Sequence, residues 1–408
     1  MMKYAHLADL HLGSWRDPKM RDLSTSAFLT AIDNCLSQNV DFILFAGDIF
    51  NTSLPSLDTL KIITKKLREL HEKNIPLYVI AGSHDFSPSG KTMIDVLENA
   101  GLLKNVCKGT INPETKQLQL HFTIDPKTGT KLTGLLGRKG LLDKIYYQNL
   151  EIDTLEAEPG YKIFLFHTTI SELKPKHLEM LDSQPASFLP KHFNYYAGGH
   201  IHHPAKIEIP EYGILTYPGA LFPNNFAELE KYSHGGYYLI TVHHHQQETE
   251  WIPLPIIKHV PIIIDCQHKS PEVITFEIMN QLNQNIDNTL ITIRLRGTLG
   301  QGRVSDLNFK DLFQQLYARG AYLILKNTSQ LTSEEFEEIK MADAEPQHVE
   351  EIIIKEHLQQ IKLFDFDTEF QLTRELLTTL NVNKREGETV TDFQQRVETD
   401  LNRLLTLQ

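Results

Sequence analysis

Residues of the types that bind metal ions follow five short apolar stretches in the first half of the chain. In order, the groups are Asp9-Leu10-His11, Gly47-Asp48-Ile49-Phe50-Asn51, Gly82-Ser83-His84-Asp85, His167 and Gly198-Gly199-His200-Ile201-His202. Each group alone is commonplace, because Asp-x-His is usually structural or exposed and Gly-Asp after a strand is usually a turn. All five in order, each directly after an apolar stretch, indicate one shared site.

The chemistry of these groups predicts a centre for divalent metal ions. Carboxylate and imidazole ligands without a thiolate suit Mn, Fe, Zn or similar ions. In an extended segment residues i and i+2 point to the same side, so Asp9 with His11, and His200 with His202, can each direct two ligands at one cluster. Asp48 can bridge two ions, and two ions roughly 3.5–4 Å apart can activate a water and stabilise a leaving oxygen.

Strands alternate with helices in the first half of the chain. Apolar strands are expected at Tyr4–Ala8, Val40–Ala46, Pro76–Ala81, Tyr161–Phe166 and Asn194–Ala197, and amphipathic helices at residues 24–38 and 56–73. This alternation predicts a mostly parallel sheet covered by helices. Binding sites of such sheets lie at the carboxyl ends of the strands, so the five groups are expected to meet there. Glycines are expected to permit tight turns at that edge, namely Gly47, Gly82, Gly198 and Gly199.

The rest of the chain divides into segments of different composition. Residues 207–241 are expected to form an antiparallel meander, and residues 250–260, which contain Pro253 and Pro255, a linker. Residues 261–330 have the pattern of a small β/α unit. Residues 334–408 are acidic and helical.

The amino-acid composition limits the classes of protein to which the chain can belong. The chain has 408 residues, of which 41% are hydrophobic and 23% charged, as in ordinary globular proteins. Its apolar runs are too short to span a bilayer and its beginning lacks a signal-peptide pattern, so a cytoplasmic location is expected. Of the net charge of −12, residues 331–408 contribute −10, with 18 Asp and Glu against 8 Lys and Arg. The nearly neutral remainder is compatible with nucleic acid, because metal ions can supply positive charge at a phosphate.

The ordered groups resemble those of the calcineurin-like metallophosphoesterase superfamily over about residues 4–240. Three stretches are similar in particular to the SbcD family of double-strand-break repair nucleases, also called meiotic recombination eleven: Leu7-Ala8-Asp9-Leu10-His11-Leu12-Gly13, Ala46-Gly47-Asp48-Ile49-Phe50 and Gly199-His200-Ile201-His202. The resemblance implies an α/β fold, a metallophosphoesterase β-sandwich flanked by helices. It also implies a nuclease domain over residues 1–250, a DNA-capping β/α domain over 251–330, and a linker with C-terminal helices over 331–408.

The same resemblance implies roles for the site residues. One metal ion would be held by Asp9, His11, Asp48 and His202, and the other by Asp48, Ser83, His167 and His200. His84 would act on the reacting phosphate as a catalytic residue, oriented by Asp85. The implied cofactors are two Mn²⁺ ions. The implied substrate is a DNA end, and the implied partners are an SbcC-type coiled-coil ATPase and a second copy of the chain, with the activity at the nucleoid.

Two positions depart from the family pattern. Position 83 is Ser where the pattern has Asn, and a hydroxyl sits on a shorter arm than an amide oxygen, so weaker binding of the second metal ion is expected. Position 51 is Asn where several relatives have a His implicated in exonuclease action. The balance between exonuclease and endonuclease activity therefore stays open.

Two other functions remain open at this point. One is a small-molecule phosphodiesterase or phosphatase of the same superfamily, which the additional C-terminal segments disfavour. The other is a catalytically weak scaffold that binds DNA ends, for which Ser83 and Asn51 are the support.

The C-terminal segment carries two apolar stripes at helical spacing. They consist of Phe393, Val397, Leu401 and Leu404 within residues 391–405, and of Val349, Ile352, Ile353 and Ile361 within residues 349–361. Short amphipathic helices need a surface to bury against. That surface is either another protein, here the ATPase, or the body of this chain.

Overall fold

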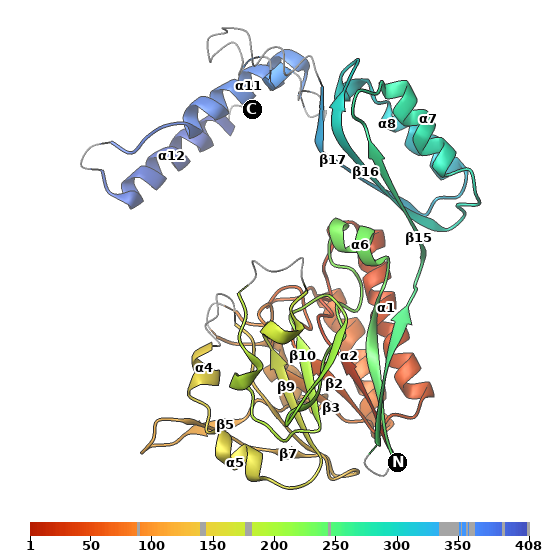
Figure 1. Ribbon diagram of the computed structural model, residues 1–408. Coiled ribbons are helices and arrows are strands. Elements are labelled where there is room, and N and C mark those ends of the chain that lie inside the picture. Colours follow the sequence, from red (N-terminus) through yellow and green to blue (C-terminus); the bar gives the residue numbers. More distant parts are fainter. Residues whose placement is uncertain are drawn as a thin grey trace. The chain divides into compact units, whose positions relative to one another are not determined.

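Figure 1 shows the computed structural model of the chain. It describes residues 1–87, 90–138, 144–175, 182–243, 246–333, 351, 353–355, 358, 364–385 and 388–405. The chain forms two compact units, of which the first comprises residues 1–260 with 288–292 and the second residues 261–287 with 293–408.

The first unit contains a six-stranded sheet in the order β14-β13-β1-β2-β3-β4. Its parallel strands are β1 (Met2–Leu7), β2 (Phe42–Ala46), β3 (Leu77–Ile80) and β4 (Lys104–Asn105), and β13 (Gly235–His243) and β14 (Gln246–Leu254) add antiparallel pairs. Three helices cover its outer face: α1 (Pro18–Ser37), α2 (Leu57–Glu72) and α3 (Met93–Asn99). Side chains such as Phe28, Ile63 and Ile94 pack there against the strands, which explains the apolar periodicity of these helices.

A second six-stranded sheet has the order β11-β12-β10-β9-β8-β7. Its parallel strands are β8 (Lys131–Gly134), β9 (Lys162–His167), β10 (Tyr195–Gly199) and β12 (Gly213–Tyr217), with β7 (Thr123–Ile124) and β11 (Ala205–Ile209) antiparallel at the edges. Its outer core includes residues from α4 (Lys144–Gln148) and α5 (Ile152–Ala157). Smaller elements are β5 (Gly109–Ile111), β6 (Leu118–Leu120), and the 3-10 turns η2 (Ser171–Leu173) and η4 (Ala186–Phe188).

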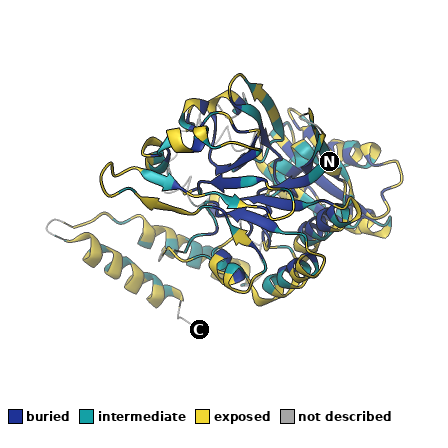
Figure 2. Cartoon of the chain, turned by 90° about the horizontal axis from the view of Figure 1, so that it is seen from below, coloured by how far each residue is buried: buried dark blue, intermediate teal, exposed yellow. Residues whose placement is uncertain are grey.

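The two sheets pack face to face around a shared core. Phe42, Leu44 and Tyr78 of the first sheet form one cluster with Ile163 and Leu165 of the second. Each sheet is thus covered on both faces, and its central strands appear as continuous buried runs in Figure 2. The α/β sandwich is confirmed, but the expectation of one parallel sheet is wrong, because β9 and β10 belong to a different sheet from β1, β2 and β3.

Two expectations for residues 207–260 are also wrong. The meander is interrupted by helix α6 (Phe226–Tyr232), after which the chain crosses to the first sheet as β13. The expected linker is largely strand, since β14 runs to Leu254 and the next strand begins at Lys258. Pro253 is tolerated because β14 lies at the edge of its sheet, where one side of the backbone makes no ladder bonds.

The second unit contains a three-stranded sheet in the order β15-β16-β17 with two helices. The elements are β15 (Lys258–Asp265), α7 (Pro271–Gln281), β16 (Thr289–Leu299), η5 (Val304–Asp306), α8 (Phe309–Ala318) and β17 (Leu323–Ser333). Their order is the one expected for residues 261–330. Pro271 occupies the first turn of α7, and the Asn308 side chain accepts a hydrogen bond from the Asp311 backbone at the start of α8. The boundaries at residues 250 and 330 remain predictions.

The described part of the C-terminal segment includes α11 (Phe366–Leu380) and α12 (Val390–Leu405), which contact one another. Neither contains a buried residue. The apolar stripe expected over residues 349–361 lies mostly outside the described residues. Among the helices that the structure describes, none is both long enough and apolar enough to cross a bilayer.

Candidate metal centre

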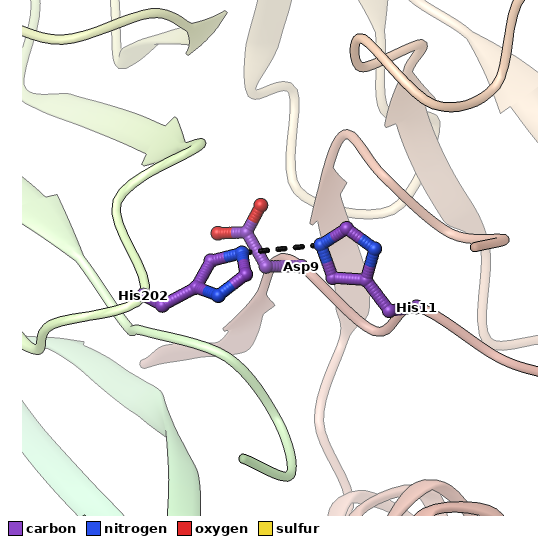
Figure 3. A group of neighbouring side chains, drawn as sticks. All are labelled: Asp9, His11 and His202. Carbon is purple, nitrogen blue, oxygen red and sulfur yellow. Dashed lines mark hydrogen bonds between the residues drawn. The ribbon is translucent and has the colours of Figure 1, made fainter. Parts of the chain in front are cut away.

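The five residue groups follow β1, β2, β3, β9 and β10, so they come from both sheets and meet where these strands end. Their side chains form three overlapping sets in which the potential ligand atoms lie within 4.8 Å of one another. The sets are Asp9, His11 and His202; His11, Asp48 and His84; and Asp9, Asp48 and His167. Figure 3 shows the first set, with the two imidazole rings turned toward each other beside the carboxylate. Together they form one donor cluster.

A left-handed backbone directs these side chains. The φ angles of Asp9, His11, Asp48 and His200 are 51°, 42°, 50° and 87°, in the region that residues other than glycine rarely adopt. Such strain persists only where the surroundings enforce it, and it concentrates at functional sites. Backbone bonds from Asp9 to Gly47 (3.2 Å) and from His11 to Asp48 (3.0 Å) hold the two loops together. The explanation by extended i, i+2 geometry is therefore wrong, although the residues converge as expected.

The glycines of the site serve mainly to allow close approach. A Cβ on Gly47 would lie 2.2 Å from Nδ1 of His167, and one on Gly199 would lie 1.9 Å from the Ala46 carbonyl oxygen. Of the four glycines expected to turn the chain, all of them described, only Gly47 has a positive φ, of 88°. A Cβ on Gly82 would lie 2.3 Å from Asp48, and one on Gly198 would lie 2.5 Å from the Phe166 ring, so of these other three only the Gly199 contact holds the two sheets close together.

Asp48 and His167 show that the cluster fits a cation. His167 donates from Nδ1 to the Ala46 carbonyl at 2.8 Å, so in the neutral ring Nε2 carries a lone pair. That atom faces Oδ2 of Asp48 at 3.2 Å in a fully buried position. Two acceptors this close require a positive charge between them, either a proton or a metal ion.

The pKa values of Asp48 and His167 also indicate that a positive charge belongs between the two side chains. Burial alone would lower the pKa of His167, but the Asp48 carboxylate outweighs it and raises this pKa to about 10. Burial would raise the pKa of Asp48, but the positive charge of His167 and its hydrogen bond hold it well below its usual range. A divalent ion can replace that proton, because metal binding to imidazole displaces it.

The other donors are suited to metal binding in different ways. Burial raises the pKa of Asp9 to about 6, against the opposing influence of His202 and His167. Asp9 accepts backbone bonds from His200 at 2.9 and 3.0 Å, one to each carboxylate oxygen. Burial lowers the pKa of His11 to about 3 and that of His200 to about 4, so both rings are neutral at pH 7 and offer a lone pair.

Glu228 is a functional neighbour that sequence reasoning missed. Nδ1 of His202 donates to Glu228 at 2.9 Å, so its Nε2 faces the cluster, 3.1 Å from Nε2 of His11. Burial would lower the pKa of His202, but the bond to Glu228 raises it overall. A carboxylate that orients a ligand histidine in this way sets its tautomer and its basicity. Asn225 three residues before Glu228 signals a helix start, but nothing local indicates the contact with His202.

Asp85 does not orient His84, which corrects the expectation. Its buried carboxylate accepts backbone bonds from Gly82 (2.9 Å), Phe50 (3.1 Å) and Ile49 (3.4 Å). Asp85 therefore ties the loop after β2 to the loop after β3, and burial raises its pKa to about 7. His84 is oriented instead by the backbone of Asn51, whose carbonyl oxygen lies 2.9 Å from Nδ1 of His84.

Ser83 and His200 lie beside the cluster. The Ser83 hydroxyl donates to Oδ2 of Asp48 at 3.4 Å, and the His200 ring centroid is 5.4 Å from that of His167. Within the described residues, His200 belongs to none of the three donor sets, whereas His84 belongs to one. The division of these residues into ligands and catalytic groups stays a prediction.

The site is a buried cluster of carboxylates and imidazoles on loops that follow the strands of two facing sheets. These features define a divalent metal site of the phosphoesterase type. Residues 2–204, about half of the chain, match the family described as Calcineurin-like phosphoesterase. The chain belongs to this superfamily.

The chain is similar to proteins named DNA double-strand break repair protein Mre11. It is 29% identical to that of Archaeoglobus fulgidus over 56% of this chain and 52% of the relative, and 30% identical to that of Methanococcus maripaludis over 58% and 61%. The matches thus span about half to three fifths of the relatives' length. A dimetal phosphatase from Danio rerio aligns with a TM-score of 0.39 and 11% identity over 61% of this chain and 95% of that one, a likeness too weak to bear on the reaction.

Proposed function

We propose that this chain is a manganese-dependent DNA nuclease, with exonuclease and endonuclease action on DNA ends in double-strand-break repair. The buried donor cluster at the meeting strand ends carries the proposal, because it offers acidic and imidazole ligands around a site that needs positive charge. The names of the Mre11 relatives support DNA as the substrate.

Two metal ions would share the Asp48 carboxylate. Asp9, His11 and His202 would complete one set of ligands, and Ser83, His167 and His200 the other. When bound, such ions supply Lewis acidity and a water of lowered pKa. The chain's own contribution is to align the ligand rings, because Nδ1 of His202 donates to Glu228 and Nδ1 of His167 donates to the Ala46 carbonyl.

His84 would act on the reacting phosphate rather than hold a metal. Since Nδ1 donates to the Asn51 carbonyl, only Nε2 is available to the substrate. In the imidazolium form Nε2 carries a proton, which can be donated to a phosphate oxygen or to the leaving oxygen. Asp85 supports His84 indirectly, because its hydrogen bonds hold together the loop that carries His84 and the loop that carries Asn51.

Manganese is the proposed ion because of the imidazoles in the site. Magnesium prefers oxygen ligands in near-ideal octahedra, whereas this cluster offers up to four imidazoles. Equal or better DNA cleavage in magnesium would contradict the ligand sets.

Partners are proposed for the outer surfaces. The α11 and α12 helices have no buried residue, although α12 has an apolar stripe, and we assign this pair to an SbcC-type ATPase. Exposed Leu54, just before α2, and exposed Leu57, its first residue, support a second copy of the chain as a further partner. The β/α unit of residues 251–330 would cap DNA at the nuclease site.

A cleavage assay on blunt, overhanging and hairpin DNA, with and without manganese, tests the proposal. We expect metal-dependent cleavage of DNA in preference to a chromogenic diester such as bis(p-nitrophenyl) phosphate. Efficient turnover of the small diester with no preference for DNA would favour a small-molecule phosphodiesterase or phosphatase. Binding of DNA ends without any hydrolysis would favour the scaffold.

A further inference from the structure

Helix α6 carries the carboxylate that orients the proposed metal ligand His202. Glu228 lies in the first turn of this helix, and Nδ1 of His202 donates to it at 2.9 Å. Two further bonds reach the same carboxylate, from the Asn224 backbone at 2.8 Å and from the Asn225 side chain at 2.6 Å. The carboxylate is therefore fixed relative to the start of α6, and the position of the helix determines how Glu228 meets His202.

Helix α6 depends on contacts at its two ends. It has seven residues, of which only Leu229 is buried. Helices this short are marginal by themselves, because few hydrogen bonds offset the cost of forming the first turn. Two side chains from other parts of the first unit hold the chain at either end of the helix, Trp15 before it and His259 after it.

Trp15 holds the segment that leads into α6. Its indole N–H donates to the Pro223 carbonyl at 2.9 Å, three residues before the helix begins. Trp15 has a φ of 61°, in the left-handed region where a bulky residue is an outlier. Such strain persists only where the surroundings enforce it. The loop of Trp15 also carries Asp9 and His11, so this bond connects two proposed ligands to the helix that orients His202.

His259 holds the end of α6. Its ring lies between two hydroxyls, with Nδ1 3.0 Å from Oγ of Ser233 and Nε2 2.9 Å from Oγ1 of Thr292. Ser233 is the C-cap residue of α6, and Thr292 is a buried residue of β16; all three belong to the first unit. Burial lowers the pKa of His259 to about 4, so the neutral ring donates to one hydroxyl and accepts from the other at pH 7. His259 thus connects the end of the helix to a buried strand.

We propose that Trp15 and His259 are positioning residues of the metal centre, which hold α6 at both ends so that Glu228 stays aligned with His202. The proposal rests on the proposed function, since it concerns a ligand of the proposed metal site. His259 belongs to none of the donor sets found among the described residues, so its influence passes through the helix. Loss of either contact leaves every proposed ligand in the chain and changes only the alignment of His202.

Calorimetric titration of manganese tests the proposal through double mutants. Trp15→Phe removes the indole N–H and keeps an aromatic ring, and His259→Ala removes the link between Ser233 and Thr292. Each change should raise the dissociation constant about threefold, less than the roughly tenfold expected for Glu228→Gln, because the carboxylate remains. Neither change should raise the constant further in the Glu228→Gln protein, which lacks the group that they align.

Two further variants separate alignment from a general loss of stability. His259→Gln retains an N–H and a carbonyl for the two hydroxyls, and it should restore the wild-type constant. Tyr78→Phe removes a side-chain bond of 2.8 Å to Asp125 at the start of β3, and it should leave the constant unchanged. Equal increases in the wild-type and Glu228→Gln backgrounds, or no increase in either, would overturn the proposal.

A measurement without metal separates this proposal from the proposed function. Ring ¹⁵N chemical shifts report which nitrogen of His202 carries a proton, and His202→Asn identifies the signals by their absence. In the metal-free wild-type protein the shifts should show a proton on Nδ1, and both Trp15→Phe and His259→Ala should move them. If the wild-type protein binds no manganese, the proposed function fails and these shifts alone decide the positioning role. Unchanged shifts in both variants would contradict it.

Discussion

The donor cluster and the C-terminal helices differ most in what surrounds them. Asp9, Asp48 and His167 are at most 2% exposed, and each is held by neighbours from another strand end. Neither α11 nor α12 contains a buried residue, and Leu380 is 58% exposed. The geometry of the metal centre is thus imposed by the core of the sandwich, whereas the helical pair lacks such support within the chain's described contacts. The geometry of the donor cluster therefore depends on the first unit, whereas the partner proposed for α11 and α12 would supply the support that they lack.

The largest effect is expected for Asp48→Asn. This change removes the carboxylate proposed to touch both metal ions, so hydrolysis should fall by roughly 10³-fold or more. Steady-state hydrolysis of DNA and of a chromogenic diester in manganese measures it. Asp125→Asn is the matched control, because Asp125 is equally buried but lies ahead of the amino end of β8, where it accepts a bond from Tyr78 at 2.8 Å. Comparable losses in both variants would mean that the effect is one of folding.

His84→Ala should lower turnover by roughly 10²-fold while leaving manganese affinity nearly intact, because His84 is assigned to proton transfer rather than to ligation. Calorimetric titration of manganese, alongside kcat, separates the two roles. His167→Ala is the comparison, since His167 faces Asp48 directly. If His84→Ala weakens metal binding as severely as His167→Ala, then the donor set of His11, Asp48 and His84 describes a true ligand set and the catalytic assignment is wrong.

Glu228→Gln should raise the dissociation constant for manganese by roughly tenfold, because the carboxylate orients His202 and increases its basicity. Equilibrium titration of the metal measures the change. Glu230→Gln provides a control on the same helix, two residues further and hence on another face. An unaltered constant in Glu228→Gln would place His202 outside the ligand set.

Ser83→Asn should lower the manganese concentration for half-maximal activity a few-fold, and Ser83→Ala should raise it only modestly. The amide oxygen reaches further than the hydroxyl, which donates to Asp48 at 3.4 Å in this chain. Titration of manganese against activity for the three proteins measures both shifts. Full activity of all three at trace manganese would show that position 83 has no part in metal binding.

Deletion of residues 345–408 should have the smallest effect on hydrolysis and remove association with the ATPase. The reason is that neither α11 nor α12 contains a buried residue. Turnover of the chromogenic diester, thermal melting and co-purification with the ATPase measure the three consequences. A marked drop in melting temperature would instead mean that the helices fold back on the body of the chain.

Much of the centre could be predicted from the chain alone. The residue types at Asp9, His11, Asp48, His167 and His202 follow apolar stretches, and strand ends are where an α/β fold gathers polar side chains. The order of elements in residues 261–330 also follows from local periodicity and turn signals. These features depend on residues that are close in sequence, so the sequence alone predicts them.

Contacts between distant segments could not be predicted. Which strands share a sheet depends on both of their faces being buried, and the runs of β2 and β9 look alike in sequence although they lie in different sheets. The linker expected at residues 250–260 begins as strand up to Leu254, because Pro253 is acceptable in a strand where the fold leaves an edge. The same applies to Asp85, which accepts hydrogen bonds from the backbone of Ile49 and Phe50, more than thirty residues away.

By itself, the sequence determined the set of available ligands and the approximate positions of the strands and helices. Only the tertiary structure decided that Asp9, His11, Asp48 and His200 adopt left-handed backbone, that Asn51 rather than Asp85 orients His84, and that Glu228 orients His202. The physical reason is that ligand chemistry belongs to single residues, whereas strain, hydrogen-bond partners and close approach of strand ends exist only when two sheets pack together.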